Sequence, residues 1–409
     1  MSFIRKIPFR ARPAYFWYAR SMILDGIFFG GAFEILNFVA RKTIGISGFQ
    51  LSFTQFFLYI GMFAGFFIPH IFQVRRKMPY IFWTSFPAKA LFIVLAFISD
   101  PNWFFWISAV ALFLAQMYIP MYAAVLKSSF PDSHRGTIVG HARSITLIGQ
   151  IAASAIAGYL LDMGKGFLGL IFPAAALCGI LSTVCFTRIR ERTPQRTQEN
   201  DALVTLSQLW HIMKNDRHFM RYQSAFALSG FANLAGLPLY VLYVVDVLKA
   251  DYFQIAITVG IINNIVGALT LAWWGRLTDR HPNPMLIRTF LSLLWMLHPL
   301  CYAFASDMTL VYLGAVLYGF LQAGGYINWL LGSLYFCNEE NTPVYTMLHA
   351  CNNGLRGAIA PLVGYLLYRC FGFFITFFLL AGMMLLASIL MFQLFLETRK
   401  LPRFNSHGQ

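Results

Sequence analysis

The sequence predicts an all-α integral membrane protein whose twelve transmembrane helices form two pseudo-symmetric six-helix bundles. Three observations carry this prediction. Of the 409 residues, 58% are hydrophobic and only 11% are charged, against about 25% charged in an average soluble domain. The apolar residues gather in runs of about 20, the length that a helix needs to cross the hydrocarbon core. Short sequence matches also repeat between the two halves of the chain.

The apolar runs follow one another along the whole chain. They cover residues 18–40, 50–73, 79–98, 103–126, 137–161, 166–187, 219–246, 253–275, 285–305, 308–334, 344–368 and 371–396. One long polar segment, 188–218, separates the first bundle, 18–187, from the second, 219–397. Residues 1–17 and 398–409 are expected to be short tails.

The charge distribution predicts the orientation in the membrane. Of the 31 Lys and Arg residues, 23 lie in segments on the same side as the N-terminus, five in the opposite loops and three within helices. Cytoplasmic loops are the ones enriched in positive charge, so we expect both termini in the cytoplasm. The net charge of +15 forms no basic stripe on a soluble domain, and we expect no nucleic-acid partner. The compact loops favour the cytoplasmic (inner) membrane of a bacterium.

The internal repeat relates the two bundles. Gly26 matches Gly230 at an offset of 204, and Gln116 matches Gln322 at an offset of 206. At this second offset Arg356 corresponds to Gln150. An even number of helices in each half gives both halves the same topology, and such repeats place a substrate site between them near mid-membrane.

One loop motif lies between the eighth and ninth predicted helices. The run Gly275-Arg276-Leu277-Thr278-Asp279-Arg280 resembles the G-x-L-x-D-R loop of the major facilitator superfamily of secondary transporters. The equivalent loop of the first half, around 70–77, is degenerate. The resemblance covers essentially the whole chain and implies solute transport by alternating access. Asp279 with its neighbouring arginines is expected to latch one access state, although a solvated turn would also explain the arginines.

Charged residues inside spanning helices are costly and usually functional. Arg356 lies deep in the eleventh helix between small residues, and its planar fork suits a carboxylate or phosphate. We interpret it as a substrate anchor, with a structural pair to Glu34 as the alternative. Glu34 and Asp25 on the first helix are the candidate proton-coupling residues. Their spacing of nine residues points them to opposite faces of a straight helix.

Two further intramembrane charges, Arg143 and Lys89, concern structure and substrate. Asp25 and Arg143 lie at similar depths, which predicts an ion pair between them that braces the bundle or works as a gate. Lys89 is expected to have a structural role. Positive intramembrane charges, with Arg356, outnumber the negative ones by three to two, which favours an anionic or zwitterionic organic solute.

Uncharged polar residues complete the candidate substrate site. Each has the donors or acceptors of a solute ligand and could equally link two helices. They are Gln116, Gln322, Asn263, Asn328, Asn352 and Tyr326.

Several function classes lack their motifs. The sequence contains no P-loop and no H-E-x-x-H, and none of the six cysteines forms a C-x-x-C pair. We therefore expect no enzyme activity, metal or cofactor. The expected partners are a small-molecule substrate, the lipid bilayer and protons, and the protein is expected to be monomeric. The alternatives are a drug or metabolite efflux pump of the same fold, or a transporter-like receptor or assembly protein without transport activity.

Overall fold

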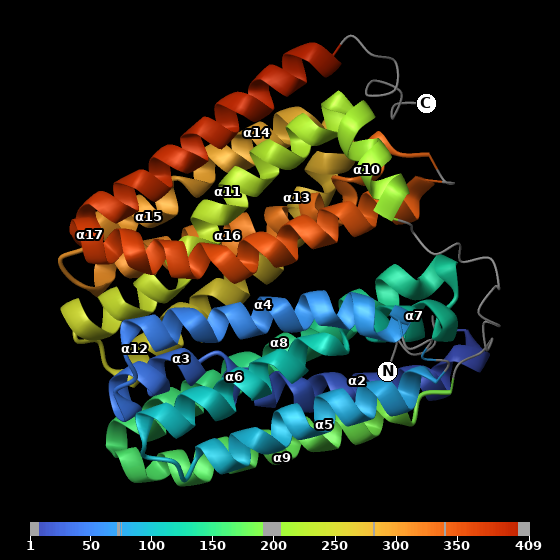
Figure 1. The fold of residues 1–409 in the computed structure, drawn as a ribbon. Coiled ribbons are helices and arrows are strands. Elements are labelled where there is room, and N and C mark those ends of the chain that lie inside the picture. The colour runs from blue at the N-terminus through green and yellow to red at the C-terminus, as the bar shows by residue number, and fades with distance from the viewer. Residues whose placement is uncertain are drawn as a thin grey trace. The chain divides into compact units, whose positions relative to one another are not determined.

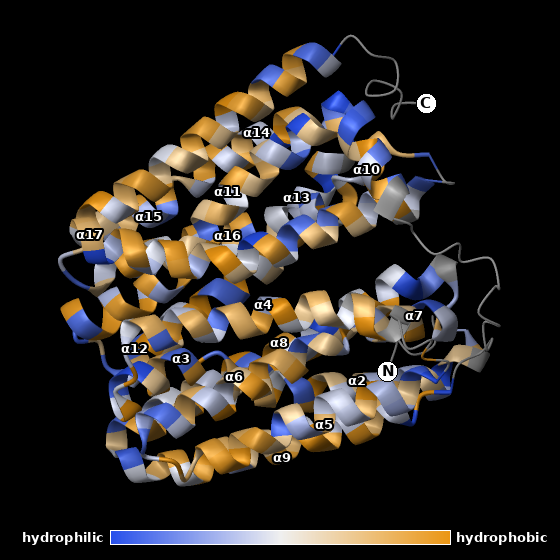
Figure 2. Cartoon of the chain, viewed as in Figure 1, coloured by the Kyte–Doolittle hydropathy of each residue, from blue (hydrophilic) through white to orange (hydrophobic). Residues whose placement is uncertain are grey.

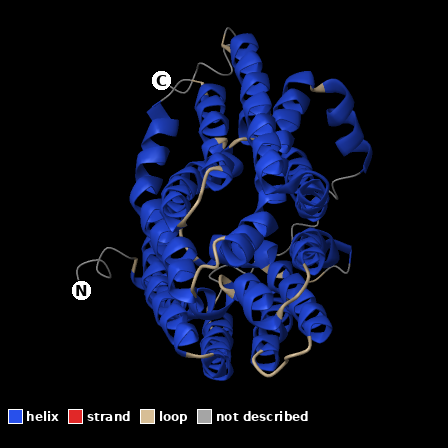
Figure 3. Cartoon of the chain, turned by 90° about the vertical axis from the view of Figure 1, so that its left-hand side faces the viewer, coloured by secondary structure: helices blue, strands red, loops and turns tan. Residues whose placement is uncertain are grey.

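The computed structural model describes residues 8–71, 74, 76–190, 206–280, 283–338 and 341–399. These residues are almost entirely helical and include no strand (Figure 3). The chain divides into two compact units. Unit 1 comprises Met1–Asp201 and Ala250–Ile261, and unit 2 comprises Ala202–Lys249 and Ile262–Gln409. Residues 250–261 come after the polar segment 188–218 in the sequence, and yet they belong to unit 1.

The first membrane-length helix of unit 1 is irregular. Its α-helical parts, α2 (Arg12–Phe28) and α3 (Leu36–Val39), alternate with the π-helical segments η2 (Phe29–Phe33) and η3 (Ala40–Ile44). Such π segments are frequent at functional sites. The extra residue in the turn changes the direction in which the following side chains point. Together the four segments form one candidate span, Arg12–Ile44.

The remaining helices of unit 1 form a bundle around this span. They are α4 (Gly48–Ile71), α5 (Lys77–Leu95), α6 (Pro101–Met117), α7 (Ile119–Ser129), α8 (Asp132–Met163), η4 (Lys165–Phe167) and α9 (Leu168–Thr187). Helix α2 packs against α8 and α9, α4 packs against α6, and α5 packs against α6 and α9 (Figure 1). Phe28, Phe92 and Phe172 pack ring against ring between α2, α5 and α9 and are at most 2% exposed.

Asp162, next to the last residue of α8, caps the helix that residues 250–261 begin. Its two carboxylate oxygens accept hydrogen bonds from the backbone N–H groups of Tyr252 and Phe253, each at 2.7 Å. These are the first residues of α12 (Tyr252–Ile255). A carboxylate is favourable there because the N–H groups of a first helical turn have no partner within the helix.

The end of η3 holds the same segment from a second side. Lys42 donates a hydrogen bond to the carbonyl oxygen of Ala250, and its ammonium lies 4.5 Å from the ring centroid of Tyr252. The hydroxyl of Thr43 is hydrogen-bonded to the hydroxyl of Tyr252. These contacts explain why residues 250–261 belong to unit 1. The π-helical segment η6 (Ala256–Ile262) follows directly and carries the chain to the boundary between the units.

We expect Asp162→Asn to weaken this attachment. An amide has one acceptor oxygen in place of two, so one of the two N–H groups loses its partner, at a cost of about 1 kcal/mol in the free energy of unfolding. Thermal unfolding of the purified protein measures the change. Asp307→Asn is the control, since Asp307 accepts from one N–H only, that of Thr309. Equal unfolding midpoints for the two variants would contradict the two-bond cap.

Unit 2 has its own set of helices. They are α10 (Leu206–Asn215), α11 (Arg217–Leu242), η5 (Tyr243–Val247), α13 (Asn263–Arg280), α14 (Pro284–Trp295), α15 (Leu297–Ala303), α16 (Met308–Leu331), η7 (Leu334–Phe336) and α17 (Thr342–Thr398). Helix α11 packs along α17, α13 packs along α16, and α14 packs against both α16 and α17 (Figure 1). The long α17 contains a break at Gly372, whose φ of 75° is left-handed; such a φ favours glycine because it has no Cβ.

The described residues contain ten helices that are long and apolar enough to cross a membrane. One of these spans, Val344–Thr398, contains two of the predicted runs, 344–368 and 371–396, on either side of the break. Helix α4 occupies the predicted run 50–73. Apolar residues extend along α9 and along the second half of α17 (Figure 2). The chain is a multi-pass membrane protein.

Candidate functional site

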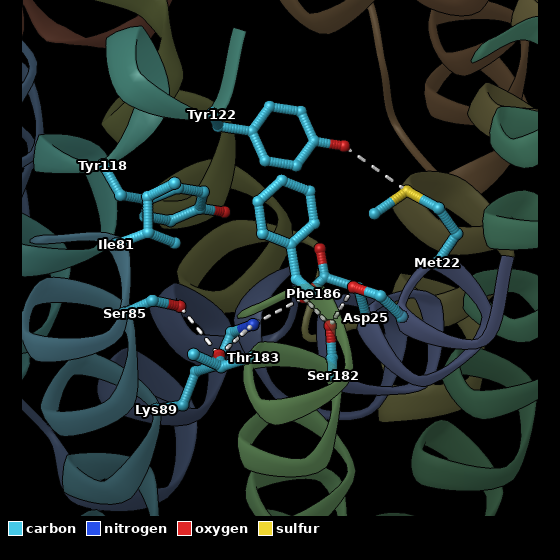
Figure 4. A pocket seen from close by; sticks show the side chains of 11 residues that line it. Met22, Asp25, Ile81, Ser85, Lys89, Tyr118, Tyr122, Ser182, Thr183 and Phe186 are labelled. Carbon is cyan, nitrogen blue, oxygen red and sulfur yellow. Dashed lines mark hydrogen bonds and ion pairs between the residues drawn. The ribbon is translucent and has the colours of Figure 1, made fainter. Parts of the chain in front are cut away.

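Unit 1 encloses a polar pocket between α2, α5, α7 and α9. Its lining consists of Ser21, Met22, Asp25, Ile81, Ser85, Lys89, Tyr118, Tyr122, Ser182, Thr183 and Phe186. Figure 4 shows the rings of Tyr118 and Tyr122 across the pocket from Ser182 and Lys89. The pocket therefore combines one charged pair, several hydroxyl groups and an aromatic wall.

The charged pair in this pocket is Asp25 with Lys89. The Lys89 ammonium donates to the Asp25 carboxylate at 2.7 Å and to the Thr183 hydroxyl at 3.2 Å. The Ser182 hydroxyl donates to the same carboxylate oxygen at 3.2 Å. Lys89 is 5% exposed and Asp25 9%, so both charges are buried and each compensates the other.

The ion pair that we predicted between Asp25 and Arg143 is wrong. Arg143 lies on α8 with an exposed side chain, and Asp25 is paired with Lys89. Depth along the helices suggested Arg143, but pairing also depends on the direction in which each side chain points. Asp25 faces α5 and α9, and Lys89 approaches it from α5.

Glu34 follows the π-helical segment η2 and has a different environment. Its Oε1 accepts a hydrogen bond from the side-chain amide of Gln150 on α8, at 2.6 Å. A Cβ built on Gly260 would lie 3.6 Å from its other oxygen, Oε2. The carboxyl group therefore lies where α8 meets the segment 250–261, in a half-buried position.

Arg356 on α17 is held against α11 in unit 2. One guanidinium nitrogen donates to the carbonyl oxygen of Phe226 at 2.7 Å, and another donates to Asn353 at 2.6 Å. The guanidinium carbon lies 4.1 Å from the ring centroid of Phe226. This close approach requires Gly230, because a Cβ there would lie within 3.0 Å of the guanidinium. In unit 1 the repeat-related Gly26 approaches the carbonyl group of Thr146 most closely, and a Cβ there would lie 3.2 Å from the backbone nitrogen of Gln150, the counterpart of Arg356.

Arg288 is a second buried cation, which the sequence analysis missed. It lies on the second turn of α14, is 5% exposed, and places its guanidinium carbon 4.5 Å from the same Phe226 ring. No ion pair joins Arg288 to a described carboxylate. In the sequence analysis Arg288 was counted, like Arg276 and Arg280, among the 23 Lys and Arg residues of the cytoplasmic segments. Its position inside the apolar run 285–305 was the signal that could have identified it.

A hydrogen-bond chain borders the two arginines. The His349 ring is hydrogen-bonded to Gln223 at 3.0 Å and packs on Phe226, with ring centroids 4.5 Å apart. The Asn352 amide donates to the Gln223 side chain at 2.8 Å. Of these residues only Asn352 was a sequence candidate, and the structure places it beside Arg356.

The other candidate substrate residues are dispersed. Asn328 is 5% exposed and donates to the carbonyl oxygen of Gly324 on its own helix. Gln322 and Tyr326 have exposed side chains, and Gln116 and Asn263 are half-buried. Their role in binding remains a prediction.

The loop motif forms the last turns of α13. Gly275 is half-buried, while the side chains of Arg276 and Arg280 are exposed. Arg276 donates to the carbonyl oxygen of Ala272 on the same helix. The Asp279 side chain lies outside the described part of the structure, so the latch stays a prediction. Across the described ranges, no three His, Cys, Asp or Glu side chains are arranged to hold a metal ion.

One protein family matches most of the sequence. The sequence profile of the Major Facilitator Superfamily matches residues 75–355. No curated protein matches the sequence significantly.

Several solved structures share the fold. The nucleoside transporter NupG (D323A mutant) superposes with a TM-score of 0.72 at 13% identity, over 93% of this chain and 100% of that one. A peptide transporter POT in complex with sulfate gives 0.69 at 14% identity, over 96% and 95%. A D-xylose-proton symporter gives 0.65 at 14% identity, over 93% and 97%. These similarities show the fold alone. With the profile match over most of its length, the chain belongs to the major facilitator superfamily.

Proposed function

We propose that the protein is a secondary transporter that moves a small organic anion by alternating access, coupled to protons. The supporting observation is the charge inside unit 2. Arg288 and Arg356 both lie over the Phe226 ring. The acidic residues whose side chains the structure describes in this unit all lie at or near helix ends; they are Asp216, Asp246, Asp307 and Glu397.

Burying a guanidinium within a helix bundle is costly unless an anion compensates it. In unit 1 the comparable cation, Lys89, has Asp25 as its compensating anion. Among the residues that the structure describes, Arg288 in unit 2 has the π face of Phe226 and no carboxylate beside it. A transported anion would supply the missing negative charge each time it binds. Cationic solutes would meet repulsion at the same place.

The finer architecture is part of this proposal. We infer twelve spans, in bundles 18–187 and 219–397, and both termini in the cytoplasm. The charge asymmetry of the loops supports the orientation, and the compact loops support a bacterial inner membrane. The protein would work as a monomer, because in this superfamily architecture one chain provides both bundles.

Charge selectivity of uptake tests the proposed function. Proteoliposomes with an inward proton gradient would be offered four labelled solutes of similar size: benzoate, phenyl phosphate, benzamide and benzylamine. We expect saturable accumulation of at least one anion and none of the amide or the amine. Accumulation of the amine or the amide alone would contradict the proposal and favour an efflux pump for neutral or cationic compounds.

Proton coupling is assigned to Glu34 rather than to Asp25. Protonating Asp25 would leave the buried Lys89 ammonium without its carboxylate, at a cost of several kcal/mol. Glu34 instead accepts a hydrogen bond from the neutral amide of Gln150. Glu34 also lies beside residue 260, next to the boundary between the units, where a change of charge could influence the access state.

We therefore expect Glu34→Gln to uncouple transport. The neutral side chain imitates the protonated carboxyl group, so exchange of internal for external anion should persist while accumulation driven by a proton gradient falls to the level of empty vesicles. Both are measured with the same proteoliposomes. Asp246→Asn, at the end of a helix in unit 2, serves as the control. Proton-driven accumulation that survives in Glu34→Gln would remove Glu34 from the coupling mechanism.

A further inference from the structure

Unit 2 contains buried hydrogen-bond donors that have no acceptor. The Tyr222 hydroxyl, the Nε of Arg288 and the indole N–H of Trp329 are all shielded from solvent and make no hydrogen bond to any described group. Tyr222 is 1% exposed and Arg288 5%. Most buried polar groups in folded proteins are hydrogen-bonded, and an unpaired one costs about 1–3 kcal/mol. Three unpaired donors in one region therefore need an explanation.

These donors lie around the rings of Phe226 and His349. Tyr222 lies 5.9 Å from Phe226 and 6.2 Å from His349, measured between ring centroids. Trp329 lies 6.3 Å from His349 by the same measure. Arg288 lies over Phe226. The residues come from α11, α14, α16 and α17, so the packing of four helices brings them together.

The region is also doubly positive. The guanidinium carbons of Arg288 and Arg356 lie 4.5 and 4.1 Å from the same Phe226 centroid, so their separation cannot exceed the sum of these distances. A second set of buried rings in unit 2 lacks this feature. There the Tyr240 hydroxyl is also unpartnered, but its ring neighbours are His298, Tyr302 and Phe377, and no guanidinium lies over them.

We propose that the donors of Tyr222, Arg288 and Trp329, together with Arg356, bind a dianionic phosphoryl group carried by the transported solute. This inference rests on the proposed anion transport and names the substrate class. A phosphate monoester carries a charge of about −1.5 to −2 at pH 7 and three strong acceptor oxygens. It thus matches two guanidinium charges and several separate donors. A monocarboxylate carries one charge and only two acceptor oxygens, fewer than the three unpaired donors of Tyr222, Arg288 and Trp329.

We expect the phosphoryl group to enter from the side of Arg356, the half-buried arginine of the cluster. Arg356 is partly exposed, whereas Arg288 and Tyr222 are buried. A phosphoryl group would meet Arg356 first and then reach Arg288 and the Tyr222 hydroxyl as the helices rearrange around it. Arg288 is then a specificity residue, because it distinguishes a dianion from a monoanion.

The test compares two anions on the same aromatic body, phenyl phosphate and benzoate. Their dissociation constants would be measured by thermal unfolding of the purified full chain at constant ionic strength and pH 8. We expect phenyl phosphate to bind at least roughly tenfold more tightly than benzoate. Arg288→Met should weaken phenyl phosphate binding by roughly 100-fold and benzoate binding far less.

Volume-conserving variants keep the test decisive if Arg288→Met does not fold. Tyr222→Phe and Trp329→Phe should each weaken phenyl phosphate binding by roughly tenfold. Tyr240→Phe removes a hydroxyl that is also buried and unpartnered, and should leave binding unchanged. Arg288→Lys should recover part of the affinity, because it restores the charge without the planar fork.

The outcomes separate this inference from the proposed function. Equal affinity for the two anions, or equal effects of Tyr222→Phe and Tyr240→Phe, would overturn the phosphoryl site. If benzoate binds and is transported while phenyl phosphate is not, anion transport stands and the phosphoryl assignment fails. If neither anion binds or is transported while benzylamine is, both fail.

Discussion

Replacing Arg356 with methionine is expected to abolish anion transport, lowering kcat/KM by at least about 100-fold. Methionine keeps much of the side-chain volume and removes the charge that lies over Phe226 and against α11. Initial rates of labelled-anion uptake in proteoliposomes measure the loss. Arg369→Met, at an exposed position on the same helix, is the matched control and should transport normally.

Gly230→Ala should reproduce much of this defect with Arg356 unchanged. The added methyl group would overlap the guanidinium and push it away from its position. Gly382→Ala is the control, because a Cβ at Gly382 meets nothing within 4 Å. Normal uptake by Arg356→Met, or equal effects of the two glycine variants, would show that the guanidinium position is unimportant for transport.

Replacing Lys89 with methionine is expected to lower the free energy of unfolding by about 3–5 kcal/mol. The change leaves the Asp25 carboxylate buried without its cation, in a pocket where hydroxyl groups supply only part of the compensation. The free energy would be measured by denaturant unfolding of the purified protein. Lys127→Met, at an exposed position on α7, should change it by less than about 0.5 kcal/mol.

The double variant isolates the cause. Asp25→Asn added to Lys89→Met removes the stranded charge, so most of the lost stability should return, because replacing both members of a buried pair is far less costly than replacing one. If the double variant is no more stable than Lys89→Met, the loss comes from packing around the lysine stem and not from the buried charge.

The helices were predictable because they depend on local sequence. A run of about 20 apolar residues forms a spanning helix almost regardless of its neighbours, and such helices occupy the predicted runs. The π-helical segments were not predictable, since η2 and η6 lie in apolar runs that a regular α-helix would also occupy. Nor was the attachment of 250–261 to unit 1, which depends on Asp162 of a distant helix end.

The candidate site was only partly predictable. Arg356 stood out because a cation in mid-run has no local explanation, and Asn352 lies beside it. Arg288 was hidden because a cation near a helix end also satisfies the charge rule for cytoplasmic loops. The partner of Asp25 depended on the rotation of helices about their axes, which apolar composition does not determine when every face of a helix is apolar.

Counterflow tests the central claim, alternating-access transport of an anion, most directly. Proteoliposomes loaded with unlabelled phenyl phosphate, and a second batch loaded with benzoate, would be diluted into a trace of the same labelled anion. The account predicts that at least one label rises transiently above its equilibrium level and that Arg356→Met abolishes this rise. A label that binds the purified protein but only equilibrates passively, with wild type and variant alike, would contradict transport and indicate a receptor with a transporter fold.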